Sequence, residues 1–378
     1  MQKRVVIIDF NHQAHTYFFS RFRLSVRVDG ADKDTTVQTN TMKNLYRWSH
    51  KGAFPTAVCF DRPVPARKMY FQSNFPDMAI GGKGEYKGGR AKMPEDLFNA
   101  ISECESLMRR AGVSVFSKEG YEADDLIYAC VKHAKKQYPG MPIDIVTNDA
   151  DLLPLVDETV SVFLRSKKGT YAEDSNIEKN KYIQVTPRNF QSVVEDLSDY
   201  KGFMMPYNSL LLHKLLRGDN SDNYKRKDIS RLFPATKWNA MMECMLRDRV
   251  NFEEAFRYGD PVREIRYNDT DELFKGSLED ALKSPDKGNL HIKLNNSEEL
   301  DCILDLLRDY SVMDEGMLDH VAKMYNGVNL NQPYGCDDPR YRRVAYNVAK
   351  SDIGGIYPFS EVELQKVLTP LQIKIIQK

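Results

Sequence analysis

Four short apolar runs, separated by stretches of helical spacing, constrain the fold of this chain more than any other feature. The runs occupy residues 4–8, 56–60, 113–116 and 143–146. Apolar side chains recur at helical intervals in residues 41–51, 94–111 and 122–138. Short continuous apolar runs are typical of strands buried on both faces, and strands that alternate with helices favour a parallel sheet. The sequence therefore predicts an α/β domain over about residues 1–200, with a mostly parallel central sheet flanked by helices.

Acidic residues gather at the ends of these predicted elements. They are Asp9, Asp61, Asp149 and Asp151 after the strands, and Glu122, Asp124 and Asp125 at the start of the helical stretch 122–138. The carboxyl ends of parallel strands form one rim of a sheet, which is where ligands bind. We therefore expect these acids to lie close together although they are far apart in the sequence.

Such a cluster of carboxylates requires cations. Two carboxylates about 5 Å apart repel each other by roughly 3 kcal/mol at an effective dielectric constant of about 20. The N-terminus of a helix offsets only about 0.3–1 kcal/mol of this repulsion. The ligand atoms in these motifs are all oxygens, without His or Cys, and such sites favour Mg²⁺ or Mn²⁺ over Zn²⁺.

The second half of the chain differs in character. Helical runs at residues 207–216, 238–246 and 298–307 dominate after about residue 200, and strand signals become sparse. We expect a helical domain over residues 201–330, followed by a tail over 331–378 to which the sequence assigns no role. A further acidic pair, Asp219 and Asp222, opens this domain, and its spacing places both residues on one side of a helical turn. A polar turn is the alternative interpretation.

A basic, glycine-rich segment interrupts the first domain. Residues 81–90 contain five glycines around Lys83, Tyr86, Lys87 and Arg90. Glycine opposes a stable helix, so this segment forms either an ordinary surface loop or part of a flexible arch that becomes ordered on a polyanion. The arch would extend over about residues 65–95. From residue 62 to 92 there are seven basic and two acidic residues, although the whole chain has 54 of each. A net charge of zero neither predicts nor excludes nucleic acid.

Several classes of protein are disfavoured. No stretch reaches the roughly 18 consecutive apolar residues of a membrane helix, and Asp9 ends the first apolar run too early for a secretory signal. The six cysteines are scattered and never form a C-x-x-C pair, which argues against a disulfide scaffold and for a reducing compartment. We expect a cytoplasmic protein, and a monomer because no heptad run suggests self-association.

The motifs GYEADD, TNDADLL and GDNSDN, preceded by a strand-Asp and by FDRP, resemble the 5′-nuclease superfamily. This superfamily includes flap endonucleases, the 5′-exonuclease domains of bacterial DNA polymerases and bacteriophage ribonuclease H-type 5′-nucleases, and the phage members are the most similar. The resemblance runs from Arg4 to Asn223. It implies a PIN-like core with a helical arch, and a structure-specific 5′-3′ exonuclease or flap endonuclease that hydrolyses phosphodiester bonds with two metals. Primer and flap removal in DNA replication would be its task, in the host-cell cytoplasm if the protein is phage-encoded.

The resemblance also implies a role for each acidic residue. The first metal site would be lined by Asp9, Asp61, Glu122 and Asp124. The second would be lined by Asp149, Asp151 and Asp222, with Asp124 between the two sites and Asp125 and Asp219 in supporting positions. Asp61, Asp124 and Asp149 would be the catalytic carboxylates. The implied cofactors are two Mg²⁺ ions, which Mn²⁺ could replace.

Nucleic-acid contacts are implied in the same way. Lys87 and Arg90 would hold the scissile phosphate, and Tyr86 would stack on a base. Further contacts would come from Arg67, Lys68, Lys83, Lys225, Arg226 and Lys227. The implied partners are branched or 5′-ended duplex DNA and RNA–DNA hybrids, with a polymerase or a single-strand-binding protein during replication.

One departure from the family leaves alternatives open. Cellular members continue after GDNSDN into a G-x-G-x-K hairpin that grips duplex backbone, whereas this chain continues with YKRKDI. A non-catalytic protein that binds branched DNA and a PIN-type ribonuclease are the two alternative functions. His12 and His15 follow the first strand, and we expect them in packing or at the surface rather than at the metals.

Overall fold

The computed structural model describes residues 2–28, 30–62, 66–75, 92–165, 182–206, 209–218, 226–246, 304, 307–308, 313–328 and 355–368. The chain divides into two compact units. The first contains residues 1–66, 90–184 and 342–378, and the second contains residues 67–89 and 185–341. This division differs from the expected one in three respects. The boundary falls after residue 184 rather than 200, the C-terminal segment belongs to the first unit, and residues 67–89, expected in the first domain, belong to the second unit.

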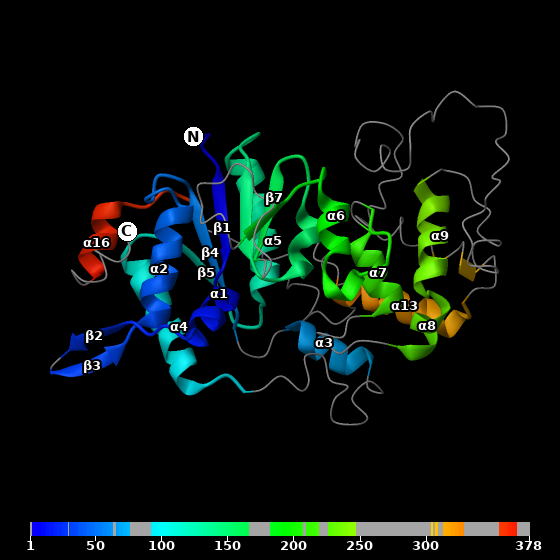
Figure 1. Ribbon diagram of the computed structural model, residues 1–378, viewed down its shortest axis with the longest axis horizontal. Helices are drawn as coiled ribbons and strands as arrows, with labels where there is room; N and C mark the ends of the chain where they lie inside the picture. The colour runs from blue at the N-terminus through cyan, green and yellow to red at the C-terminus, as the bar shows by residue number, and fades with distance from the viewer. Residues whose placement is uncertain are drawn as a thin grey trace. The chain divides into compact units, whose positions relative to one another are not determined.

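A six-stranded sheet forms the centre of the first unit, with the strand order β5-β4-β1-β6-β7-β8 (Figure 1). The strands are β1 (Val5–Asp9), β4 (Thr56–Phe60), β5 (Ser114–Ser117), β6 (Ile143–Thr147), β7 (Val160–Arg165) and β8 (Tyr182–Val185). β1 pairs in parallel with β4 and β6, β4 with β5, and β6 with β7. β1, β4 and β6 are buried along their whole length. The prediction of a mostly parallel sheet is confirmed. Burial on both faces holds for β1, β4 and β6, whereas β5, at the edge of the sheet, is only half-buried.

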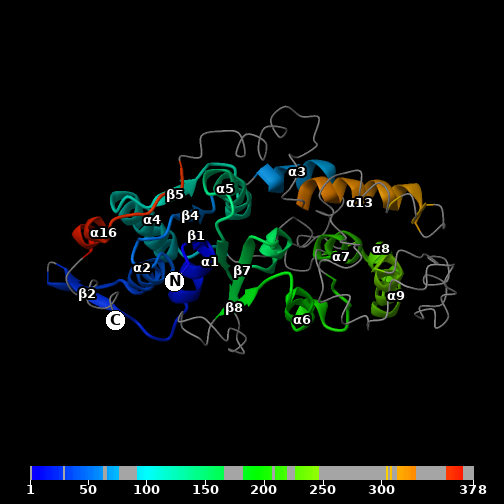
Figure 2. The ribbon, with the colours of Figure 1, turned by 90° about the horizontal axis from the view of Figure 1, so that it is seen from above.

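Helices cover both faces of this sheet. Alternate side chains of a strand point to opposite faces. Val6 and Ile8 of β1 belong to a buried cluster with α1 (Phe10–Phe18), α2 (Thr36–Trp48) and α4 (Glu95–Arg110). On the other face, the Sγ atom of Cys59 in β4 lies 3.9 Å from that of Cys130 in α5 (Ala123–Gln137). Figure 2 shows α2 and α5 on opposite sides of β1 and β4.

An antiparallel hairpin, which the sequence pattern did not predict, follows α1. It consists of β2 (Ser25–Val28) and β3 (Ala31–Asp34), with Gly30 in the turn at a φ of 82°. β3 reads Ala-Asp-Lys-Asp and is exposed throughout. An exposed strand of this kind lacks the apolar alternation by which strands are found in a sequence.

The described part of the second unit is helical. Its helices are α3 (Ala66–Asn74), α6 (Phe190–Glu195), α7 (Leu210–Arg217), α8 (Lys227–Leu232), α9 (Ala235–Leu246) and α13 (Glu315–Val328), with a 3-10 helix η3 (Ser198–Tyr200). α3 packs on α13, because the Tyr70 hydroxyl donates to the Lys323 carbonyl at 3.0 Å and the rings of Phe75 and His320 are 5.0 Å apart. Most of the expected helix at 298–307 lies outside the described residues.

The C-terminal segment 355–368 returns to the first unit and ends in α16 (Glu361–Val367). Phe359, Leu364 and Leu368 join the buried cluster between the sheet, α2 and α4. None of the helices in the described ranges is long and apolar enough to cross a membrane.

Candidate functional site

Asp9 is the most buried carboxylate at the carboxyl rim of the sheet. It ends β1 and is 1% exposed. Its Oδ2 accepts a hydrogen bond of 2.7 Å from the Thr147 hydroxyl, whereas Oδ1 is buried without a hydrogen-bond partner. Burial raises the pKa of Asp9 to about 6, and the negative charges of Asp61 and Asp149 contribute, against the opposing effect of His12 and Thr147. A buried carboxylate oxygen without a donor is a position that a cation can occupy.

The turn after β6 carries the next two acids. The Asp149 amide donates to the Thr147 hydroxyl at 2.9 Å, and that hydroxyl in turn donates to Asp9. Oδ1 of Asp149 accepts from the Asp151 amide at 2.9 Å and caps the 3-10 helix η2 (Ala150–Leu155). A chain of hydrogen bonds therefore connects the ends of β1 and β6 and fixes Asp9 and Asp149 relative to each other.

The turn after β4 is tied to the start of α5. Oδ1 of Asp61 accepts from the Ala123 amide at 2.6 Å. Glu122 and Asp125 form a reciprocal capping box at the start of α5, in which the Glu122 amide donates to Asp125 Oδ2 at 3.2 Å. Both residues are buried, at 4% and 6% exposure. Asp125 thus holds the helix start that carries Glu122 and Asp124, in keeping with a supporting position.

The position of His12 differs from the expected one, in packing or at the surface, because its side chain contacts an acid of the rim. Its Nε2 lies 3.4 Å from Oδ2 of Asp149. Burial by itself would lower the pKa of His12, but the hydrogen bond with Asp149 and the charges of Asp9, Asp149 and Asp124 outweigh burial and raise the pKa above the usual range. The imidazolium form therefore compensates part of the negative charge at the rim. The sequence held one signal, because position 12 lies one turn beyond Asp9 on a helix that starts at the rim.

The structure brings most of the expected acids of the first unit to one rim, but it does not group them closely enough to form a metal site. Asp9, Asp61, Asp124 and Asp149 interact electrostatically with one another or with His12. Across the described ranges, however, no three His, Cys, Asp or Glu side chains are grouped closely enough to hold a metal ion. Asp219 and Asp222 lie outside the described residues. The donors at the rim are carboxylate oxygens, so their chemistry fits Mg²⁺ or Mn²⁺.

The expected nucleic-acid contacts are only partly described. Lys83, Tyr86, Lys87, Arg90 and Lys225, and the side chain of Arg67, lie outside the described residues. Lys68 is half-buried on α3. Arg226 pairs with Asp228 at 2.9 Å and donates to the Gly316 carbonyl at 3.3 Å, so it is not simply free for phosphate. Lys227 is exposed on α8.

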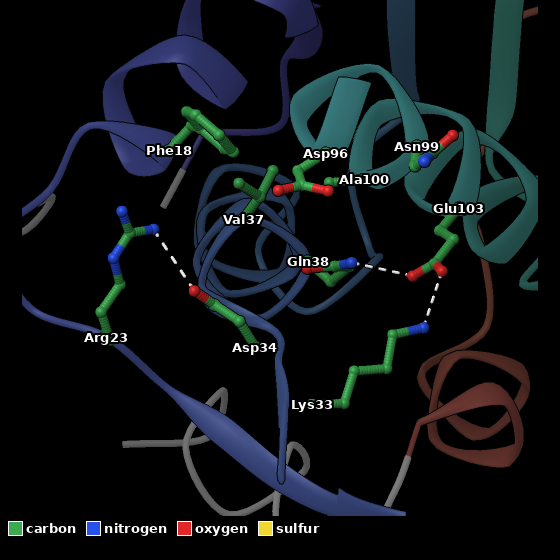
Figure 3. Close-up of a pocket in the computed structure, with 10 residues that line it drawn as sticks. All are labelled: Phe18, Arg23, Lys33, Asp34, Val37, Gln38, Asp96, Asn99, Ala100 and Glu103. Carbon is green, nitrogen blue, oxygen red and sulfur yellow. Dashed lines mark hydrogen bonds and ion pairs between the residues drawn. The ribbon is translucent and has the colours of Figure 1, made fainter. Parts of the chain in front are cut away.

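A cavity of about 580 Å³ lies elsewhere in the first unit (Figure 3). Its walls come from the end of α1, the hairpin β2–β3, α2 and α4, and include Phe18, Arg23, Val37 and Asp96. Two ion pairs line it, Arg23 with Asp34 at 3.3 Å and Lys33 with Glu103 at 2.7 Å. None of the expected metal ligands lines this cavity, so the acid rim is a separate site.

Comparison with known proteins finds similarities that lie mainly in the first unit. Residues 4–182 match the family model of the 5′-3′ exonuclease N-terminal resolvase-like domain. The 5′-3′ exonuclease of Mycoplasma pneumoniae is 26% identical over 225 residues, which are 58% of this chain and 66% of that protein. DNA polymerase I of Chloroflexus aurantiacus is 30% identical over 139 residues, 37% of this chain and 13% of the polymerase. The chain thus spans less than two thirds of the length of either relative.

A solved structure of T5 5′-exonuclease with divalent metal ions (zinc) bound is also similar, at 15% identity and a TM-score of 0.44, covering 99% of this chain and 98% of that one. Through residues 4–182, the chain is thus similar to the N-terminal resolvase-like domain of 5′-3′ exonucleases.

Proposed function

We propose that this protein is a divalent-metal-dependent, structure-specific 5′-nuclease. The observation that carries the proposal is the Oδ1 atom of Asp9, a buried oxygen without a hydrogen-bond donor, on a carboxylate that also lies near the charges of Asp61 and Asp149. Burying such a group costs free energy that a cation at the rim would recover. The similarity of residues 4–182 to a 5′-3′ exonuclease domain supports this proposal, because these acids lie within the matched range.

We propose that the acids at the rim form two groups, each of which would hold one cation. Asp9, Asp61, Glu122 and Asp124 would hold one cation, and Asp149 and Asp151 would hold a second together with Asp222. Two divalent ions bound there would activate a water molecule, neutralise the phosphate and stabilise the leaving oxygen. Thr147 orients Asp9 and Asp149 through its hydroxyl. His12 balances the charge of Asp149 and would be displaced from it when a cation binds.

The substrate that we propose is a 5′-ended or branched duplex, either DNA or an RNA–DNA hybrid such as a primed lagging strand. A basic arch over residues 65–95 would hold the single-stranded 5′ end, with Lys87 and Arg90 on the scissile phosphate. Contacts by Lys227 and its neighbours to phosphates would make binding weakly dependent on sequence. A replicative polymerase or a single-strand-binding protein would be the natural partner of such an activity.

The first test is cleavage of three 5′-labelled substrates: a flap duplex, a nicked RNA-primed duplex and a blunt duplex. Each is incubated with Mg²⁺, with Mn²⁺ and with a chelator. We expect metal-dependent release of short 5′ products from the flap or the primer, and the product lengths separate exonucleolytic from flap cutting. Binding without cleavage in both metals would instead favour the non-catalytic binder of branched DNA, and cleavage of single-stranded RNA alone would favour the PIN-type ribonuclease.

A variant separates catalysis from binding. Asp149→Asn removes one charge from the rim and should lower the cleavage rate by at least about 100-fold, because even the loss of an outer-shell partner costs about 10–100-fold at metal sites. Binding to the flap duplex, measured by fluorescence anisotropy in Ca²⁺, should change little. Asp32→Asn, the same substitution at an exposed position of β3, is the matched control and should cleave like the original protein. Equal loss of binding and cleavage in Asp149→Asn would contradict the metal role.

A further inference from the structure

A partly buried ion cluster lies beside the acid rim. One of its members, Arg62, belongs to the FDRP run, whereas Glu105, Arg109 and Ser117 lie outside the motifs that resemble the superfamily. Its centre is Glu105 of α4, which is 8% exposed. Nη2 of Arg62 lies 2.8 Å from Oε1 and 2.6 Å from Oε2 of Glu105. Arg109 Nη2 donates to Oε1 at 2.9 Å, and the Ser117 hydroxyl donates to the same oxygen at 2.7 Å. Three elements therefore converge on one carboxylate: the end of β4, the end of β5 and α4.

This cluster is connected directly to two of the expected metal ligands. Arg62 is the residue after Asp61. Its backbone amide donates to the Tyr121 carbonyl at 3.2 Å, while Asp61 Oδ1 accepts from the Ala123 amide at 2.6 Å. These two hydrogen bonds hold the turn with Asp61 against the turn with Glu122. The guanidinium of Arg62, fixed on Glu105, anchors the same turn from its other side.

Stability alone is a weak reason for such an arrangement. Removing two charges from water is costly, and apolar replacements of buried ion pairs are often as stable as the pair or more stable. What an arginine–carboxylate contact supplies is defined geometry. At metal sites, partners that do not touch the metal orient the ligands that do. The position of the cluster, one residue from Asp61, fits that role.

We propose that Glu105 is a positioning residue, which acts through Arg62 to fix the spacing of the Asp61 and Glu122 carboxylates and thereby sets the affinity of the first metal site. This inference rests on the proposed function, because it assigns the two carboxylates to a cation. Neither Glu105 nor Arg62 touches the metal or the substrate in this account. The Arg109 and Ser117 contacts with Oε1 of Glu105 keep its carboxylate in place.

The test is direct Mn²⁺ binding to the whole protein, measured by electron paramagnetic resonance of the free ion. Glu105→Gln keeps the shape of the side chain but places an amide group against the guanidinium of Arg62. We expect a loss of Mn²⁺ affinity of about 10-fold at the tighter site, in the lower part of the range for outer-shell partners. Cleavage should show the same shift in its half-saturating Mn²⁺ concentration, with a rate at saturating metal within about 3-fold of the original.

Glu103→Gln is the matched control. It makes the same change two residues earlier on α4, at a carboxylate that pairs with Lys33 and Gln38 across the separate cavity of Figure 3. It should bind Mn²⁺ like the original protein. If Glu105→Gln and Glu103→Gln bind Mn²⁺ with equal affinity, the positioning role is overturned.

A second variant covers the case in which Glu105→Gln does not fold. Arg62→Lys keeps the charge next to Asp61 but has a single compact ammonium in place of the guanidinium. It should also weaken Mn²⁺ binding, and an unchanged affinity would count against the proposal. The proposed function fails separately: if the original protein binds no Mn²⁺ and cleaves no 5′ end, the rim is not a nuclease site, whatever the two variants show.

Discussion

At the scale of single residues, the site is marked by the buried negative charge of Asp9, which lowers the stability of the folded protein. Asp9 is buried, keeps one oxygen without a donor and lies near the charges of Asp61 and Asp149. Only Thr147 and His12 oppose this effect within the described residues. Functional sites often retain such unfavourable groups because the ligand, rather than the protein, satisfies them. The metal-free protein should therefore gain stability when the charge is removed.

Asp9→Asn makes this prediction quantitative. The pKa of Asp9 is about 6 in the folded protein, against the ordinary value of 3.8 for an aspartate in an unfolded chain. Because the folded state binds the proton more tightly, it loses relative stability as the pH rises from 3.8 through 6. At about 1.4 kcal/mol for each pKa unit, the loss approaches roughly 3 kcal/mol at about pH 8. In chelator, Asp9→Asn should increase the unfolding free energy by up to about that amount at about pH 8 and by little at about pH 4.

The measurement is urea denaturation in chelator at the two pH values. Asp32→Asn, at an exposed position, should leave the unfolding free energy unchanged at both. Adding Mn²⁺ at the higher pH should reverse the order, because a cation that binds only the folded original protein stabilises it by mass action. A metal-free Asp9→Asn protein that is less stable than the original at the higher pH would contradict the buried-charge account.

At the scale of secondary-structure elements, the C-terminal segment is an integral part of the first unit. The Phe359 amide donates to the Gly52 carbonyl at 3.1 Å, and the Thr56 amide at the start of β4 donates to the Tyr357 carbonyl at 3.2 Å. The Tyr138 hydroxyl donates to the Ile356 carbonyl at 2.6 Å. Ile356 is fully buried. The segment therefore contacts residues that follow α2, begin β4 and follow α5. Its loss would expose the buried cluster that α16 covers.

At Gly52, the packed C-terminal segment leaves no space for a side chain. Its φ is 85°, and a Cβ atom would lie 2.3 Å from the Phe359 carbonyl oxygen. Gly52→Ala should cost roughly 3 kcal/mol of unfolding free energy, since a left-handed alanine costs about 1–2 kcal/mol and overpacking about 1–3 kcal/mol. Gly112→Ala has a similar φ of 75° but open space around the Cβ position. That control should cost only about 1 kcal/mol, and equal losses in urea denaturation would refute the docking argument.

These elements also show what the sequence could and could not predict. β1, β4 and β6 were predictable because burial on both faces leaves continuous apolar runs. The docking of residues 355–368 left no such signal, because the segment bonds mainly through its own backbone groups, to scattered residues such as Gly52, Ser114 and Tyr138. The acids of the first unit could be located from their place after strands. The pairing of His12 with Asp149 depends on the direction of one side chain, which spacing alone does not give.

At the scale of the whole molecule, the charges are balanced but unevenly placed. The chain has 54 basic and 54 acidic residues, so it has no net field to attract a polyanion over long distances. The first unit gathers carboxylates at its rim. In the second unit, Lys227 and Arg231 lie four residues apart on α8, and both are exposed or partly exposed. Ile229 and Ser230 face the interior, so the helix presents a basic side to solvent. Binding of nucleic acid should therefore depend on local phosphate contacts.

The salt dependence of binding tests this view. Each phosphate contact releases counterions and contributes about 0.9 to the slope of log K against log salt concentration. In an Asp149→Asn background, which prevents cleavage, Lys227→Ala and Arg231→Ala together should reduce the magnitude of that slope for a flap duplex by about 2. Lys366→Ala, an exposed lysine of α16 that pairs with Glu363 at 2.5 Å, should leave it unchanged. An equal slope in all three proteins would mean that α8 does not contact the duplex.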